Sequence, residues 1–340
     1  MYTYLLRRLN LLVLTTLVLL GLLYAATLAM PGDPISNLSG IQEPTLAEEA
    51  EVIHRYRLDQ STLSGYLAYV QHRLAGDLGY SLSTGEPVME QVRTYLPASL
   101  ELAAVAMMMA LLVGIPFGIL AASRRGLLAK ILWALTLLGF SLPVFWLGLL
   151  LMLTFGIELD WLPPSGRFNL LYDVPDRSGF VLLDIMMSDA PWRWAALRDA
   201  VNHLILPAAV LATLPTTIIV RTIRIAMLAE MDKNYIRALT ARGVHRARLV
   251  LFHALPNAMA PLFRTLSLQI GSLASSAIIV EVIFSWPGLG GWVLSALHQG
   301  DFTALQGGIL VISLFIIVLG IVMEILQALL NPISRKEIHG

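Results

Sequence analysis

The sequence predicts an all-α integral membrane protein on three observations: the composition, the repeated apolar runs and the uneven charge of the segments between them. The 340-residue chain is 57% hydrophobic and only 14% charged, with a mean hydropathy of +0.73. Apolar runs of about 20 residues recur along it, which is the length that an α-helix needs to cross a bilayer. Helices satisfy their backbone polar groups internally, so we expect the spans to be helical.

Six uncharged runs reach or approach the length that spans a bilayer, the fourth and fifth being short, and each predicts a membrane helix. They are residues 9–30, 102–122, 131–157, 204–220, 265–280 and 303–323. Arg7 and Arg8 precede the first run, which is longer than a signal-peptide core and is followed by no Ala-x-Ala cleavage site. Residues 1–30 are therefore expected to form a retained signal-anchor helix.

Prolines in the third and fourth runs indicate where an interior should lie. Pro143 falls in the third run, and Pro207 and Pro215 fall in the fourth. A proline frees a carbonyl that the helix would otherwise bond, and at membrane depth only a neighbouring helix or water can satisfy that carbonyl. Together with Ser141, these prolines are the residues that we expect to line an internal path through the membrane.

Charges in the connections predict the orientation of the chain. Residues 31–99 hold nine acidic residues against four Lys or Arg, and residues 158–203 hold seven against four. The connection 221–264 instead holds eight Lys or Arg and two acids. Lys and Arg favour the cytoplasmic side, so both termini, including the tail 331–340, are expected in the cytoplasm. Other basic residues agree with this orientation: Arg7, Arg8, Arg124, Arg125 and Lys130.

The two external connections have different patterns. The segment 31–99 is expected to form a small ordered subdomain, because helical periodicity runs from Leu46 to Leu58 and from Leu63 to Leu74. The loop 158–203 is more irregular and is interrupted by four prolines. Connections of this length are usually functional or disordered.

The basic connection 221–264 predicts two short helices that meet at a glycine. Asp232 is the expected N-cap, Gly243 the expected left-handed stop, and a second helical pattern runs from Val244 to Pro256. A glycine at the corner permits a tight bend and the close approach of another backbone. The composition by itself suits two roles: docking on a cytoplasmic protein, or lying on anionic lipid headgroups.

Two stretches of this connection resemble the coupling-loop signature of binding-protein-dependent ABC importer permeases. They are Tyr235-Ile236-Arg237-Ala238-Leu239-Thr240-Ala241-Arg242-Gly243 and His253-Ala254-Leu255-Pro256-Asn257-Ala258. The family signature reads Glu-Ala-Ala, three residues, then Gly. Arg237 and Leu239 depart from it, and Arg at the first of these positions is common in the peptide-transport branch. The resemblance implies that the ATPase-coupling residues are Tyr235, Arg237, Ala238, Ala241, Gly243, Leu255, Pro256 and Asn257.

Further motifs along nearly the whole chain resemble the first permease subunit of dipeptide and oligopeptide importers. They are Met30-Pro31-Gly32-Asp33-Pro34, Gly76-Asp77-Leu78-Gly79-Tyr80-Ser81, Phe284-Ser285-Trp286-Pro287-Gly288-Leu289-Gly290 and Asn331-Pro332. This resemblance implies a type I ABC importer permease fold with six transmembrane helices, an external subdomain and a cytoplasmic coupling helix. Residues 100–330 would form its five-helix core.

A second branch of the same family is an alternative assignment for this chain. The segments Pro164-Ser165-Gly166-Arg167-Phe168 and Gly179-Phe180 also resemble the Sap permeases. Uptake of antimicrobial peptides or polyamines is therefore an alternative to the uptake of di- or oligopeptides.

The resemblance also implies the partners and the compartment. A permease of this kind lies in a bacterial inner (plasma) membrane and works with a second homologous permease subunit, two cytoplasmic ABC ATPase subunits and an extracytoplasmic peptide-binding protein. ATP and Mg would be bound by the ATPase subunits and not by this chain, which has no Gly-x-x-x-x-Gly-Lys-Ser/Thr motif. The expected partners include the lipid bilayer and no nucleic acid.

Neither a catalytic nor a metal-binding constellation is expected in this chain. It has no cysteine, and its seven histidines lack the spacing of metal ligands. A transport subunit without enzymatic activity is the prediction. The remaining alternative is a proton-coupled carrier that works alone, with Glu101, Glu281 and Glu324 as its acids. Their position at span ends favours capping or snorkelling instead.

Overall fold

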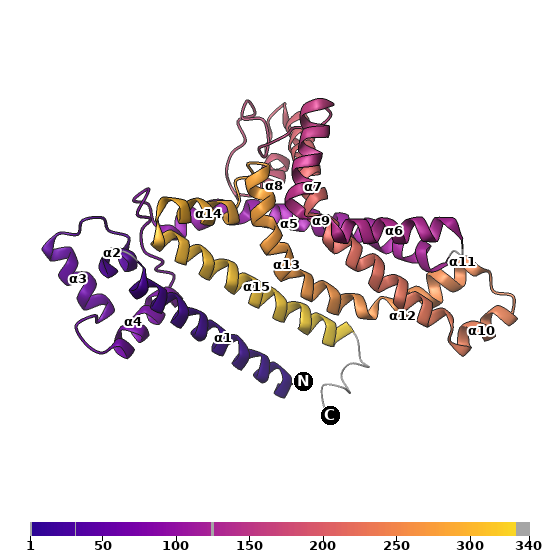
Figure 1. Ribbon diagram of the computed structural model, residues 1–340, viewed down its shortest axis with the longest axis horizontal. Helices are drawn as coiled ribbons and strands as arrows, with labels where there is room; N and C mark the ends of the chain where they lie inside the picture. The colour runs from indigo at the N-terminus through magenta and orange to yellow at the C-terminus, as the bar shows by residue number, and fades with distance from the viewer. Residues whose placement is uncertain (1, 31, 124–125, 331–340) are drawn as a thin grey trace. The chain divides into compact units, whose positions relative to one another are not determined.

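The computed structural model describes residues 2–30, 32–123 and 126–330, and it is mostly helical (Figure 1). Its described residues form two compact units. Unit 1 comprises Met1–Ser99, Asp176–Val181 and Pro287–Val318, and unit 2 comprises Leu100–Pro175, Leu182–Trp286 and Leu319–Gly340, in each case within the described ranges. The predictions on Pro31, Arg124, Arg125, Asn331-Pro332 and the tail 331–340 lie outside the described residues.

The helices follow one another along the chain in the order in which Figure 1 labels them. Their bounds are α1 Tyr2–Ala29, α2 Pro34–Ser39, α3 Leu46–Tyr56, α4 Thr62–Leu74, α5 Val88–Ser123, α6 Leu127–Ser141, α7 Val144–Leu151, η1 Met152–Glu158, α8 Val181–Met186, α9 Arg193–Met231, α10 Asn234–Ala241, α11 Arg246–Arg248, η2 Leu249–Ala254, α12 Leu255–Ala258, α13 Ala260–Ile283, α14 Leu289–Gln299 and α15 Phe302–Leu330. Two of them, η1 and η2, are π-helical turns.

Five helices are long and apolar enough to cross a membrane: α1, α5, α9, α13 and α15. They confirm five of the six predicted spans. The fourth span is much longer than the uncharged run suggests, because α9 has 39 residues. Hydropathy marks only the part of a helix that suits hydrocarbon, and the charged ends of α9 continue beyond that part.

The third predicted run, residues 131–157, is not one straight helix. It forms α6 and a second segment of α7 and η1, and the two are bent by 105° at Leu142 and Pro143. Leu142 has an extended backbone, with φ −78° and ψ 125°. Proline disfavours a helical conformation in the residue before it and cannot donate to the preceding turn. The run therefore forms a sixth span only if α6 and the segment of α7 and η1 together cross the membrane.

Unit 1 has an aromatic and aliphatic core built by α1, the short helices α2 to α4, α14 and the first part of α15. The ring of the buried Tyr24 lies 5.4 Å from that of Tyr69. Gln306 Oε1 accepts hydrogen bonds from Thr27 (2.9 Å) and from Tyr69 (3.3 Å). The helices α3 and α4 confirm the two that periodicity predicts within residues 31–99.

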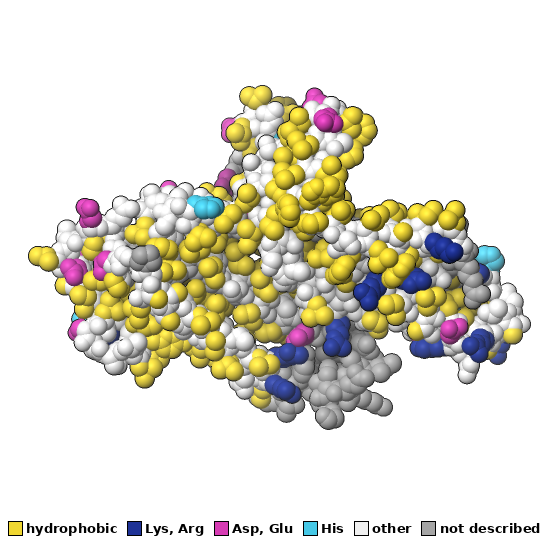
Figure 2. Space-filling view, in the orientation of Figure 1, with side chains coloured by type: hydrophobic (Ala, Val, Ile, Leu, Met, Phe, Trp, Pro, Cys, Tyr) yellow, Lys and Arg dark blue, Asp and Glu magenta, His cyan; other side chains and the backbone are white. Residues whose placement is uncertain are grey.

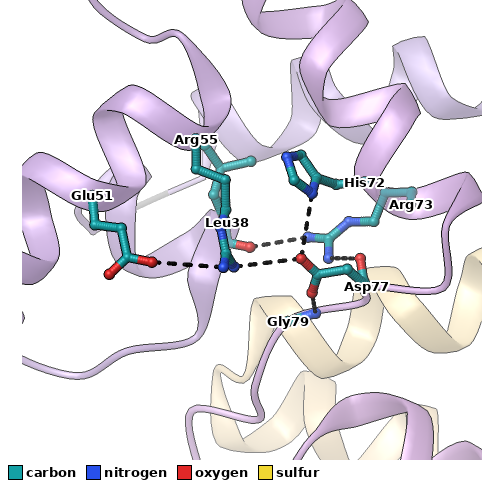
Figure 3. Close-up of polar contacts among 7 residues, drawn as sticks. All are labelled: Leu38, Glu51, Arg55, His72, Arg73, Asp77 and Gly79. Atoms are coloured by element: carbon teal, nitrogen blue, oxygen red, sulfur yellow. Dashed lines mark hydrogen bonds and ion pairs between the residues drawn. The ribbon is translucent and has the colours of Figure 1, made fainter.

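A polar cluster around Asp77 fixes the turn that follows α4 (Figure 3). Asp77 Oδ1 accepts from the Gly79 N–H at 3.1 Å, and Oδ2 lies 3.5 Å from Arg55 and 3.6 Å from His72. The buried Arg73 donates to the carbonyls of Asp77 and Leu38. The Gly-Asp-Leu-Gly motif thus joins α2, α3 and α4. These contacts give the motif a packing role in unit 1.

Asp301 precedes α15 and holds its first turn to the loop after α4. Its Oδ1 accepts from the Ala304 N–H at 3.0 Å, and its Oδ2 accepts from the Ser81 hydroxyl and from the Ser83 N–H and hydroxyl. Asp301 is only 1% exposed. Burial raises the pKa of Asp301, but the hydrogen bonds from Ser81, Ala304 and Ser83 outweigh burial and hold the pKa below the usual aspartate value.

Replacing Asp301 with alanine should lower the free energy of unfolding by about 2–4 kcal/mol, because a helix cap is lost and buried donors lose their acceptor. The effect should appear in thermal unfolding of the detergent-solubilised protein. A carboxylate with a lowered pKa stabilises above its unfolded pKa of about 3.9, and this contribution is lost as the pH falls through the folded pKa. The difference between wild type and variant should be constant near neutral pH and shrink below about pH 4. Equal melting temperatures at neutral pH would contradict the assignment.

Unit 2 is organised around α9, which packs against α6, α7, α12 and α13. Glycines let α5 and α6 approach it closely. A Cβ atom added at Gly118 would lie 2.7 Å from Ile223 Cβ, and one at Gly139 would lie 2.8 Å from Thr217 Cγ2. Small residues at such contacts are the usual means of packing membrane helices tightly.

A buried ion pair ties the irregular 158–203 segment to the part of α5 around Glu101, within unit 2. Glu101 Oε2 accepts from Arg167 Nη2 (2.6 Å) and Nε (3.1 Å), and Glu101 Oε1 accepts from the Leu182 N–H at 2.9 Å. The side chains of Glu101 and Arg167 are 6% and 11% exposed. The Gly166 N–H also donates to Phe284 O at 2.9 Å. Glu101 therefore has a structural partner, which favours a packing role over that of a mobile proton carrier.

Candidate functional site

The connection after α9 folds as a helix, a corner and a second helical segment. α10 (Asn234–Ala241) leads to Gly243, which adopts φ +77°. The Gly243 N–H donates to Thr240 O at 3.0 Å, and the Val244 N–H donates to Leu239 O at 3.2 Å. This pair of bonds forms a Schellman motif, which places a left-handed residue at the corner. The prediction that Gly243 provides the left-handed stop is confirmed.

Two details of the predicted loop are wrong. Asp232 does not cap α10: it is the C-cap residue of α9, and Lys233 occupies the N-cap position of α10. The reason is that α9 extends to Met231 and leaves room for only a short linker. The second predicted helical pattern does not end at Pro256, because Pro256 lies in the first turn of α12. A proline is tolerated there because the N–H it lacks has no helical acceptor in a first turn.

A hydrogen-bonded group joins the end of α9 to the start of α10 and to the segment η2–α12. The Tyr235 hydroxyl donates to Glu230 Oε1 at 2.7 Å and lies 3.2 Å from the His253 carbonyl oxygen. The Asn257 amide donates to Tyr235 Oη (3.1 Å) and to His253 O (3.2 Å). Lys233 Nζ lies 2.6 Å from Glu230 Oε2. These five residues are the loop anchor.

The loop anchor keeps its charge state near neutral pH. The hydrogen bond to Glu230 raises the pKa of Lys233, and burial followed by the hydrogen bond to Glu230 raises the pKa of Tyr235. Lys233 thus stays protonated and Tyr235 stays neutral at pH 7. Glu230 itself is 6% exposed, so its carboxylate depends on these two donors in place of water.

The outer surface of the loop is basic and carries exposed apolar side chains. Ile236 faces inward at 2% exposed, whereas Arg237, Ala238 and Ala241 are exposed on α10. On η2, Phe252 is 73% exposed. Figure 2 shows Lys and Arg side chains gathered over the region of α9 to α12. Exposed apolar side chains among cations suit a contact with another protein or with a lipid surface better than free solvent.

The structure brings only some of the predicted coupling residues together. Tyr235 and Asn257 meet in the loop anchor, while Arg237, Ala238, Ala241, Gly243, Leu255 and Pro256 are distributed over α10, the corner and α12. Sequence reasoning missed Glu230, Lys233 and Phe252. The i, i+3 spacing of Glu230 and Lys233, and a large apolar residue in a basic loop, are the signals that could have found them.

The predicted path residues occupy two different settings. Pro207 and Pro215 are buried within the continuous helix α9. Ser141 and Pro143 are exposed and flank the bend after α6, where the Ser141 hydroxyl donates to Leu137 O at 2.9 Å. The described residues contain no cluster of three His, Asp or Glu that could hold a metal ion.

Several helices of membrane-spanning length, and a basic helix–glycine–helix loop after α9, define a class: a multi-pass helical membrane protein with a structured basic loop. Residues 114–336 match the family model described as the binding-protein-dependent transport system inner membrane component. The chain belongs to this family of ABC transporter permease components.

Relatives with known names match most of the chain. The di/tripeptide transport system permease protein DppB of Pseudomonas aeruginosa (strain UCBPP-PA14) is 40% identical over 99% of this chain and 100% of its own length. The peptide transport system permease protein SapB of Salmonella typhimurium (strain LT2) is 42% identical over 77% of this chain and 82% of its own. The putrescine export system permease protein SapB of Escherichia coli (strain K12) matches with the same identity and coverage.

A solved structure supports the fold. A chain of the MetNI methionine ABC transporter, determined in inward-facing conformations, matches with a TM-score of 0.52 and 16% identity, covering 72% of this chain and 99% of its own. At this identity the match concerns the fold, which is that of a type I ABC importer permease.

Proposed function

We propose that this chain is a membrane-spanning subunit of an ATP-driven, binding-protein-dependent importer of di- or oligopeptides. The observation that carries the proposal is the 40% identity, over 99% of the chain, to a permease named for di/tripeptide transport. The two SapB relatives, one named for peptide transport and one for putrescine export, match only 77% of the chain. Because the DppB relative matches nearly the whole chain, we favour short peptides over amines as the substrate.

The partners follow from the family. A second homologous permease completes the pathway, two cytoplasmic ABC ATPases bind ATP and Mg, and an extracytoplasmic binding protein delivers the peptide. Both termini lie in the cytoplasm in this proposal, because the basic segment 221–264 and Arg7 and Arg8 belong on that side. The acidic segments 31–99 and 158–203 then face outward.

In the proposed mechanism, ATP binding closes the ATPase pair and moves the loop that docks on it. The coupling residues are Tyr235, Arg237, Ala238, Ala241, Gly243, Leu255, Pro256 and Asn257. The loop anchor ties them to α9, and α9 carries Pro207 and Pro215 in the bundle. A stiff connection turns a displacement at the loop into a rotation of the helices between inward-open and outward-open states. Ser141 and Pro143 at the bend complete the proposed path.

The test is uptake by proteoliposomes that contain the co-purified assembly. The proposal expects two ATPases and a second permease to co-purify with the chain. Labelled dipeptide should accumulate only with the binding protein and with ATP on the ATPase side, and excess unlabelled dipeptide should compete better than putrescine. Accumulation by the chain alone without nucleotide would refute the ATP-driven proposal, and better competition by putrescine would refute its substrate class.

A further inference from the structure

The contact line between α6 and α9 carries basic residues that the proposed coupling loop does not use. The Arg224 guanidinium carbon lies 4.5 Å from the centroid of the Trp133 ring. Arg221 comes one turn before Arg224 on α9, and Lys130 comes one turn before Trp133 on α6, so each pair shares a helix face. Arg221 and Lys130 are exposed. Lys130, Trp133, Arg221 and Arg224 form what we call the α6–α9 seam.

The cations of the seam lack a counter-charge from the part of the chain that the structure describes. α6 contains no acidic residue, and α9 contains none between Asp199 and Glu230. Glu230 is engaged with Lys233 and Tyr235 in the loop anchor. The Nε atom of Arg224 is buried and has no hydrogen-bond partner within the described residues. Arg224 therefore carries its charge without an ionic partner among the described residues, and the exposed cations Lys130 and Arg221 beside it offer that charge cluster to an anionic group of another molecule.

The position of the seam along α9 indicates which molecule. Residues 200–220 contain no Asp, Glu, Lys or Arg. At 1.5 Å per residue they extend about 31 Å, close to the hydrocarbon thickness of about 30 Å. Arg221 is then the first charge beyond the hydrocarbon, and Arg224 lies one turn further, at headgroup depth. Tryptophan is enriched at this depth, which suits Trp133.

We propose that the α6–α9 seam binds the phosphate of an anionic phospholipid. Arginine presents several N–H donors in a plane that fits phosphate oxygens, and Trp133 holds the Arg224 guanidinium in place by its ring face. Lys130 and Arg221 supply further positive charge to the same headgroup. This proposal concerns lipid recognition and does not depend on the proposed import of peptides.

The experiment measures lipid retention by the assembly purified in mild detergent and equilibrated with mixed micelles of phosphatidylglycerol and phosphatidylcholine. Native mass spectrometry should show selective retention of phosphatidylglycerol by the wild type. Removing one seam cation should weaken retention about fivefold, and the double variant Arg221→Gln with Arg224→Gln about 25-fold. Arg224→Lys keeps the charge but not the planar donor array, so it should retain more phosphatidylglycerol than Arg224→Gln and less than the wild type, which separates binding from folding.

Arg198→Gln is the matched control, because Arg198 is an exposed arginine at the other end of the same helix. It should leave retention at the seam unchanged. Equal retention by the double variant and the wild type, or equal loss of both lipids, would overturn the proposal. Displacement of the lipid by added inorganic phosphate would assign the seam to free phosphate. Retention of neither lipid by the wild type would likewise overturn it.

Discussion

Replacing Gly243 with tryptophan should abolish peptide-stimulated ATP hydrolysis and uptake while the chain still inserts and assembles. Gly243 sits at φ +77° in the Schellman motif after α10, where a side chain costs about 1–2 kcal/mol. Apart from the flanking residues of the chain, no atom lies within 4 Å of a Cβ added at Gly243, so the start of the indole meets open space. In the proposed complex it would meet the ATPase. The measurement is ATPase activity with and without peptide-loaded binding protein in proteoliposomes.

Matched variants separate backbone strain from bulk at Gly243. Asparagine tolerates the left-handed conformation and should retain most of the stimulation, and alanine isolates the strain and should fall between asparagine and tryptophan. Arg237→Ala, on the exposed face of α10, should have a small effect because single exposed charges contribute little. Full stimulation in Gly243→Trp would remove this corner from the coupling site.

Glu230→Ala should uncouple the transporter, with uptake at least about tenfold lower and basal ATP hydrolysis retained. The carboxylate of Glu230 accepts the Tyr235 hydroxyl at 2.7 Å and pairs with Lys233 at 2.6 Å. Losing a buried acceptor costs about 1–3 kcal/mol per orphaned donor, and about 1.4 kcal/mol corresponds to a factor of ten. Without the loop anchor, α10 can move without moving α9. The ratio of peptide transported to ATP hydrolysed is the quantity to measure.

Three further variants rank the contacts of the loop anchor. Glu230→Gln keeps an acceptor for Tyr235 and should stay close to the wild type, because the lost ion pair involves the exposed side chain of Lys233. Lys233→Gln should likewise have little effect. Tyr235→Phe keeps the ring but removes the hydroxyl, so it should resemble Glu230→Ala in a weaker form. A transport-to-hydrolysis ratio in Glu230→Ala equal to that of the wild type would contradict the lever role of the anchor.

The limits of the sequence prediction are clearest in the membrane spans. Uncharged runs located α1, α5, α9, α13 and α15 because transfer of apolar side chains into hydrocarbon depends on composition over about 20 residues. The same runs did not show that α9 continues to Met231. They also did not show that the third run bends by 105°, although Pro143 is visible in the sequence. Whether a proline bends a helix depends on how its neighbours pack.

The candidate site divides in a similar way. The left-handed role of Gly243 could be predicted because glycine adopts positive φ without steric cost. The acceptor role of Glu230 could not be predicted, because it depends on Tyr235 and Asn257 meeting from two different helical segments. The residue type of Asp232 favours an N-cap of α10, but α9 continues to Met231 and places Asp232 at its own C-cap.

By itself, the sequence determined that this chain is a helical membrane protein, where its apolar spans lie and which connection is basic, since these properties sum over neighbouring residues. Only the tertiary structure decided which polar groups pair: Glu101 with Arg167, Glu230 with Tyr235, and Arg224 with Trp133. Each pair joins different segments of the chain, and its energy exists only when packing brings the two side chains to contact distance. The free energy of transferring a segment into the membrane depends on its own composition and can be estimated from the sequence. The energy of a side-chain pair depends on the distance between its two members, which only the fold sets.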